Sequence, residues 1–169
     1  MTVKKGQLLS SPPDTFRKSF DIASPVSGQV QPLNAIDGTL YTQGYFGPGA
    51  VINAPSSSIK APFNGICTRV TPLDYAIEIK SSVGLKCLIK FGESTQHLHG
   101  AQFNCHVKRG STFKAGAVLF TVNTGWLKQQ GVNNVCIMTL LNANALLGVM
   151  PTTRKYVEAV EDPLLTLFV

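Results

Sequence analysis

Histidine is the first residue type to consider for chemistry, because a neutral imidazole can bind a metal or act as a nucleophile near pH 7. The chain has three histidines: the pair His97 and His99, separated by one leucine, and His106. On a strand, His97 and His99 would point to the same side and could share a metal ion. A catalytic zinc ion needs three protein ligands. We therefore expect no catalytic metal and no cofactor, and treat His97 and His99 only as weak metal candidates.

Lys90 is the second residue of interest, since it interrupts an apolar run between Ile89 and Phe91. A lysine with an ordinary pKa of about 10.4 is protonated at neutral pH and has no lone pair for attack. Burial can lower that pKa by several units, so a nucleophilic Lys90 is one alternative. A solvated or hydrogen-bonded lysine is the more common case, and we expect it here.

The elements that position Lys90 have the pattern of a β-hairpin. Residues 75–80 alternate between apolar and polar side chains, starting at Tyr75, and residues 85–91 form a second apolar run. The turn residues 81–84 between them reverse the chain. A hairpin of this kind would place Tyr75 and Lys90 on neighbouring strands.

A short motif occurs twice, 37 residues apart, at residues 24–30 and 61–67. In each copy a proline fixes the entry to a turn, and a glycine, Gly28 or Gly65, is expected to supply a positive φ before a strand. The repeat predicts an internal duplication.

Composition and pattern together predict an all-β domain. The 169 residues include 15 glycines and 10 prolines, and only 14% are charged. Such a mixture is typical of short strands joined by tight turns. Further strands are expected at residues 47–53, 135–140 and 164–169, a glycine-punctuated turn region at 107–120, a helix at 124–130, and short turns near 94–98 and 141–146. We expect a flattened barrel or sandwich of mainly antiparallel strands with one or two short helices.

Residues 60–100 resemble the glucose-type enzyme IIA proteins of the bacterial sugar phosphotransferase system. In that family an A-P-x-x-G turn leads to N-H-A-[FI] and then to [VI]-H-F-G-x-[DE]-T, and the two histidines form the phosphoryl-transfer site. The first histidine falls here on Tyr75 and the second, which carries the phosphoryl group, on Lys90. The resemblance covers residues 20–169 and implies the duplicated hybrid fold, with residues 1–19 as a flexible N-terminal segment.

The resemblance also implies a surface for partner proteins: the donor HPr, a permease domain or a regulated enzyme. In the family an apolar ring around the histidines docks HPr, and acidic residues support it. The matching positions here are Leu40, Tyr41, Tyr45, Phe46, Leu88 and Gln96. Gln96 replaces an apolar residue, and Ser94 and Gly38 stand where acids are expected. Docking of the original donor should therefore be weak, and an acidic partner becomes plausible. The aromatic residues from Tyr41 to Phe46 could equally belong to the core.

The same resemblance suggests a ligand hypothesis. If Tyr75 and Lys90 are neighbours, their phenol and ammonium would form a donor-rich pocket beside Leu88, Tyr41 and Phe46 that attracts an anion or another small molecule. The alternative is that Lys90 extends along the apolar surface with its charge in solvent.

Two rival families share parts of the pattern. Residues 92–100 are similar to the S-T-G-x-H-x-H-F segment of lysostaphin-type zinc endopeptidases, but the upstream ligand pair of that family is missing. Residues 110–120 have the glycine rhythm of biotinyl and lipoyl carrier modules, but no M-K-M or D-K-A triplet supplies the carrier lysine.

Composition excludes several further classes. The four cysteines form no C-x-x-C pair and read as buried free thiols of a cytoplasmic protein. No apolar run is long enough to insert in a membrane and no signal peptide is evident. The net charge of +6 comes from scattered basic residues, so we expect no nucleic-acid binding. The favoured hypothesis is a non-phosphorylatable, regulatory or protein-binding enzyme IIA-like protein; the alternative is an active phosphocarrier that uses other residues.

Overall fold

The computed structural model describes residues 6–35, 45–53 and 56–169, which form three β-sheets. The largest sheet has eight strands in the order β10-β6-β7-β8-β12-β4-β3-β14. Their bounds are Gly28–Pro32 for β3, Gly49–Asn53 for β4, Gly65–Thr71 for β6, Ala76–Ser81 for β7, Lys86–Phe91 for β8, Thr112–Phe113 for β10, Val135–Leu140 for β12 and Tyr156–Val157 for β14. All neighbours in this sheet are antiparallel.

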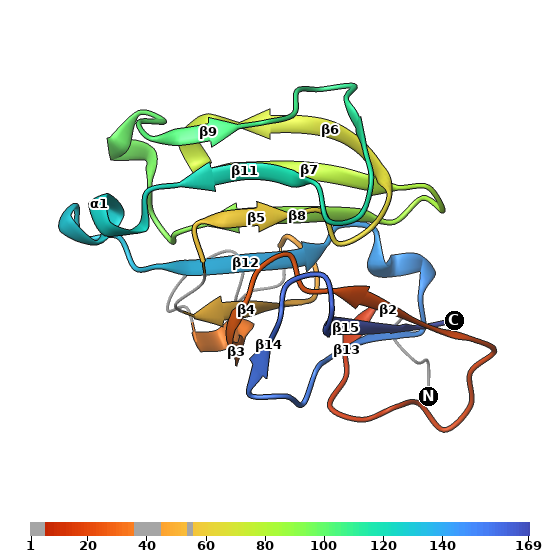
Figure 1. Ribbon diagram of the computed structural model, residues 1–169. Helices are drawn as coiled ribbons and strands as arrows, with labels where there is room; N and C mark the ends of the chain where they lie inside the picture. The colour runs from red at the N-terminus through yellow and green to blue at the C-terminus, as the bar shows by residue number, and fades with distance from the viewer. Residues whose placement is uncertain (1–5, 36–44, 54–55) are drawn as a thin grey trace.

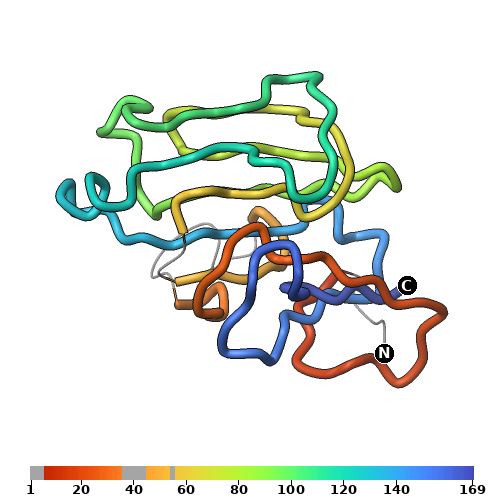
Figure 2. The backbone as a smooth tube through the Cα atoms, in the orientation of Figure 1, coloured from red at the N-terminus to blue at the C-terminus, as the bar shows by residue number. Residues whose placement is uncertain are grey.

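Two smaller sheets complete the molecule. One has the order β1-β13-β15-β2, with β1 at Gln7–Leu8, β2 at Ser19–Ala23, β13 at Gly148–Pro151 and β15 at Pro163–Phe168. The other has the order β5-β11-β9, with β5 at Ser58–Lys60, β9 at Phe103–Cys105 and β11 at Val118–Val122. Figures 1 and 2 show the three-stranded sheet over the half of the large sheet that contains β6, β7 and β8.

Apolar side chains from all three sheets meet in one core. It includes Ile77, Ile79 and Ile89 from the large sheet, Phe120 from the three-stranded sheet and Leu165 from the four-stranded sheet. Burial of the apolar surface of these side chains is the main contribution to the stability of the fold. Each sheet is open and has edge strands, so of the two shapes predicted the sandwich is the one observed.

The predicted helix is confirmed as α1, Thr124–Gln129, at the left of Figure 1. Its first turn is capped by Asn123, whose side chain accepts a 3.0 Å hydrogen bond from the Trp126 N–H. The other helical pieces are single 3₁₀ turns: η1 at Leu33–Ala35, η2 at Pro72–Asp74, η3 at Gln96–Leu98 and η4 at Ala143–Ala145.

The duplicated motif precedes equivalent strand pairs, because β3 pairs with β4 as β6 pairs with β7. The predicted reason for its glycines is wrong: neither Gly28 nor Gly65 has a positive φ. Gly65 is instead required by close approach, since a Cβ atom there would lie 2.2 Å from the Lys80 carbonyl oxygen of β7.

The described part of residues 1–19 is attached to the domain through β1 and through its last residues, where the Arg17 and Lys18 N–H groups donate to the Val169 carbonyl. Strand β1 pairs in parallel with β13, and the Phe16 ring packs edge-on against Phe168 at 4.9 Å. The division of the chain near residue 20 stays a prediction, and β2 begins at Ser19.

The cysteines are free thiols, as predicted. Cys67, Cys87 and Cys136 are buried and Cys105 is half-buried. Burial raises the pKa of Cys87 and of Cys136 to about 12, which keeps both thiols protonated.

Candidate functional site

Lys90 lies on β8, the second strand of the hairpin, which runs between β7 and β12. It pairs with Ala76 on β7 and Ile137 on β12. Alternation along β8 sends Cys87, Ile89 and Phe91 into the core. Lys90 and Leu88 therefore lie on the opposite side of the large sheet, which we call the outer face. Lys90 is nevertheless only 2% exposed.

The buried ammonium of Lys90 is held by the two 3₁₀ turns at the end of the hairpin. It donates hydrogen bonds to the Asp74 carbonyl of η2 and, at 3.4 Å, to the Thr95 hydroxyl just before η3. Thr95 in turn donates to the Leu73 carbonyl at 2.9 Å, and the Gln96 amide donates to the Asp74 carboxylate at 2.7 Å. We call these five residues, Leu73, Asp74, Lys90, Thr95 and Gln96, the Lys90 network.

Burial lowers the pKa of Lys90 to about 8, and the nearby Asp74 carboxylate opposes that shift. At pH 7 the amine is still mainly protonated. The ammonium is also occupied by two neutral acceptors, so it has neither a lone pair nor free space for a phosphoryl group.

Tyr75 is directed to the other side of the sheet. It follows η2 in the left-handed conformation, with φ 50° and ψ 46°. The strand was predicted to begin at Tyr75, but β7 begins one residue later, at Ala76. Its side chain is fully buried, its ring lies 5.3 Å from Phe103, and its hydroxyl donates to the Ala101 carbonyl. Burial raises the pKa of its phenol.

Two predictions are therefore wrong: that Tyr75 and Lys90 form a shared anion pocket, and the alternative that Lys90 extends along the surface with its charge in solvent. The two donors face opposite sides of the sheet and bond separate acceptors, so they form no shared anion pocket. Lys90 does not keep its charge in solvent, because its side chain is almost completely buried. The expectation of a hydrogen-bonded lysine is confirmed.

The histidines do not form the arrangement expected on a strand. His97 lies in η3, and His99 caps it in the left-handed conformation with φ 53°. All three histidines are exposed. Within residues 6–35, 45–53 and 56–169, no three histidine, cysteine or acidic side chains come together as metal ligands.

The predicted partner-binding residues are in varied environments. Leu40 and Tyr41 lie outside the described residues. Tyr45 is 73% exposed and packs edge-on against Phe46, with ring centroids 5.0 Å apart. Leu88 is buried on the outer face, and Gln96 is exposed although its amide bonds Asp74.

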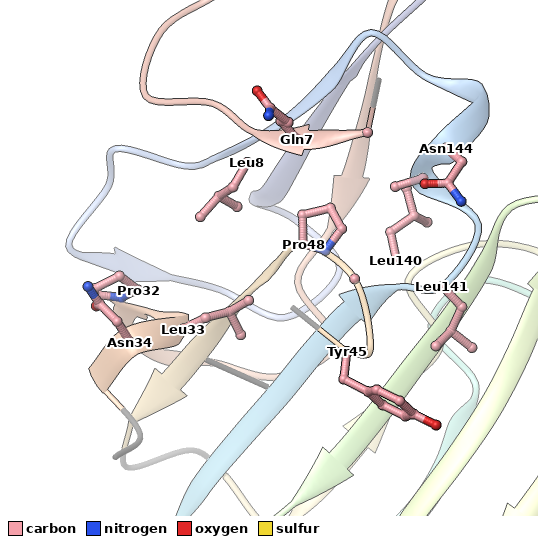
Figure 3. A pocket seen from close by; sticks show the side chains of 13 residues that line it. Gln7, Leu8, Pro32, Leu33, Asn34, Tyr45, Pro48, Leu140, Leu141 and Asn144 are labelled. Atoms are coloured by element: carbon pink, nitrogen blue, oxygen red, sulfur yellow. The ribbon is translucent and has the colours of Figure 1, made fainter. Parts of the chain in front are cut away.

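Tyr45 also lines a cavity of about 580 Å³ together with Leu33, Pro48, Leu140 and Leu141, as Figure 3 shows. An exposed aromatic beside a hollow is typical of a protein contact surface, and this favours the interface reading of Tyr45 over the core reading.

Sequence reasoning missed the Lys90 network itself. Thr95 belonged to the family motif, but its position gave no sign that its hydroxyl would connect Lys90 to the Leu73 carbonyl. The available signal was a charged residue inside an apolar strand, which requires buried acceptors nearby.

Residues 20–146 match the model of the phosphoenolpyruvate-dependent sugar phosphotransferase system, EIIA 1. The chain belongs to this family. The enzyme IIA resemblance seen in the hairpin motif is therefore confirmed over three quarters of the sequence.

A solved structure supports the fold. The glucose permease IIA from Mycoplasma capricolum superposes on this EIIA chain with a TM-score of 0.72, over 89% of this chain and 96% of that one. The two are 22% identical, so this likeness concerns the fold. Within the described part of this EIIA chain, no helix is both long and apolar enough to cross a membrane.

Proposed function

We propose that this chain is a degenerate glucose-type enzyme IIA that accepts no phosphoryl group and acts as a regulatory or protein-binding member of the sugar phosphotransferase system. Tyr75 and Lys90 take the two positions that the family pattern gives to histidines. We also place the protein in the cytoplasm, which its four free thiols support.

The observation that carries the proposal is the environment of Lys90. A phosphoryl acceptor must offer a lone pair to an incoming phosphorus atom, with room for the donor protein. Lys90 is buried and protonated at pH 7, and its ammonium is bonded to Asp74 and Thr95. The supporting position is equally closed, because Tyr75 is directed into the core.

The test is incubation of the protein with phosphoenolpyruvate, enzyme I and HPr, followed by intact mass measurement. We expect no mass increase, while a histidine-containing enzyme IIA in the same reaction gains one phosphoryl unit. An acid-labile phosphoryl group mapped to His97, His99 or His106 would overturn the proposal and favour the active phosphocarrier.

The double variant Tyr75→His/Lys90→His is a sharper test of the scaffold. We expect Lys90→His alone to gain little, since Tyr75 would still fill the supporting position. If the double variant folds and gains a phosphoryl group while the single variant does not, the loss of function is local to these two side chains.

A further inference from the structure

Basic residues that are scattered in the sequence come together on the outer face of the large sheet. Arg69, Lys86 and Arg109 line one cavity of about 770 Å³, with Glu78 as the single carboxylate in its lining. They come from β6, β8 and the turn before β10. The fold thus creates a local charge excess that the sequence did not indicate.

No described carboxylate lies within ion-pair distance of these three cations. Arg69 and Glu78 are opposite each other on β6 and β7, yet no ion pair joins them. Among the residues that the structure describes, the one ion pair within 4.0 Å is Arg154 with Asp162, which is not part of this cavity. Arg69, Lys86 and Arg109 are all exposed.

The basic cavity adjoins the residues proposed for partner binding. Lys86, Leu88 and Lys90 alternate on the same side of β8, and Glu78 of the cavity is the cross-strand neighbour of Leu88. Leu141 lines both this cavity and the one that contains Tyr45. Figure 3 shows Leu141 and Tyr45 among the side chains that line that second cavity.

We propose that this continuous surface docks an acidic protein segment, with an apolar side chain against Tyr45 and Leu141 and carboxylates against Arg69, Lys86 and Arg109. The inference deepens the proposed function and rests on it, since it names the kind of partner that the protein would bind. Exposed guanidinium groups match carboxylates in geometry as well as charge. Complementary charge also raises association rates and excludes basic partners.

The experiment uses the full chain and a synthetic peptide with one phenylalanine between two pairs of glutamates. Amide chemical shifts are followed by NMR at 50 mM salt, with a peptide in which lysine replaces glutamate as the comparison. We expect the acidic peptide to shift the amides of Arg69, Lys86 and Leu141, and the basic peptide to shift none of them. Binding should weaken as salt rises.

The variant Arg69→Gln/Arg109→Gln removes two cations from the cavity. We expect its dissociation constant for the acidic peptide to rise roughly tenfold. The matched control Lys128→Gln/Lys155→Gln removes the same charge from exposed positions on α1 and beside β14, and should bind as the wild type does. An amide spectrum of each variant confirms that it is folded.

Three results would overturn the inference: no shift at millimolar acidic peptide, equal binding by the Arg69→Gln/Arg109→Gln variant, or tighter binding of a single-stranded oligonucleotide or inorganic phosphate at the same residues. The phosphoryl-transfer assay is independent of this titration. A protein that takes no phosphoryl group and binds no acidic peptide keeps the proposed function and loses only this inference.

Discussion

At the scale of single residues, Lys90 carries a charge at a position where strand neighbours are apolar. Its partners Ala76 and Ile137 are buried, and its acceptors are a carbonyl and a hydroxyl, not a carboxylate. Burial therefore stabilises the charged amine less than water does in the unfolded chain, which lowers the pKa of Lys90 to about 8.

This shift predicts a pH dependence of stability. Between pH 8 and 10.5 the unfolded chain binds more protons at Lys90 than the folded one, so the free energy of unfolding rises with pH in that window. The cost of burying the charged Lys90 amine is fully present below pH 8. At pH 10.5 that cost is smaller by roughly 3 kcal/mol.

Urea titrations of the wild type and Lys90→Met at pH 7, 9 and 10.5 would measure it. Because Cys87 and Cys136 also titrate in the unfolded chain, the quantity to compare is the difference between the two proteins at each pH. As pH rises, the free energy of unfolding of the wild type should increase relative to that of Lys90→Met. Lys86→Met, on the same strand but exposed, should show no such trend; a similar trend there would contradict the assignment.

Thr95 predicts a second effect. Thr95→Val keeps the shape of the side chain but removes the hydroxyl that donates to the Leu73 carbonyl and accepts from Lys90. We expect a loss of about 1–3 kcal/mol in the free energy of unfolding, measured by urea denaturation at pH 7. Thr112→Val, at an exposed strand position, is the control and should change stability little. Equal losses in the two variants would show that the buried hydroxyl has no special role.

At the scale of elements, strands and turns could be predicted because their signals are local. Period-two alternation gave the β7–β8 hairpin, and the apolar run at residues 135–140 gave β12. The Lys90 network could not be predicted in the same way, because it joins residues 16 and 22 positions apart through the packing of two 3₁₀ turns. The basic cavity likewise depends on three separate segments, so its charge was not visible in the sequence.

Two glycines near the hairpin are required for different reasons: Gly65 because another strand lies too close for a side chain, and Gly84 because of its positive φ. Gly65→Ala would place a Cβ atom 2.2 Å from the Lys80 carbonyl oxygen, so β6 must move away from β7. Gly84→Ala, in the turn after β7, meets nothing within 4 Å but has to keep φ near +95°. We expect a cost of about 1–2 kcal/mol for Gly84→Ala and a larger one, roughly 3 kcal/mol or more, for Gly65→Ala.

Thermal denaturation of the two variants beside the wild type would rank these costs. A Gly65→Ala protein as stable as Gly84→Ala would mean that β6 and β7 can separate without loss of packing.

At the scale of the whole molecule, one core spans all three sheets, so its parts should unfold together. The reactivity of Cys87 and Cys136 can test this cooperative unfolding. Both thiols are fully buried in that core, and their raised pKa values suppress the reactive thiolate. At pH 8 we expect iodoacetamide to modify neither in the folded protein and both in guanidinium chloride.

Peptide mass mapping after timed labelling would check this, with half-buried Cys105 as the internal comparison. Labelling of Cys87 or Cys136 faster than global unfolding would reveal a local opening of β8 and β12.

The pairing of β2 with β15 also has a consequence for synthesis on the ribosome. Asp21 and Thr166, joined by a side-chain hydrogen bond, are 145 residues apart in sequence. At roughly 5–20 residues per second, β2 waits on the order of ten seconds or more for its partner to be translated. Until then the Ile22 side chain, which is buried in the folded core, has no finished sheet to cover it, whereas Phe20 is exposed even in the folded protein. The nascent chain therefore presents an unpaired β2 that a ribosome-associated chaperone would be well placed to hold.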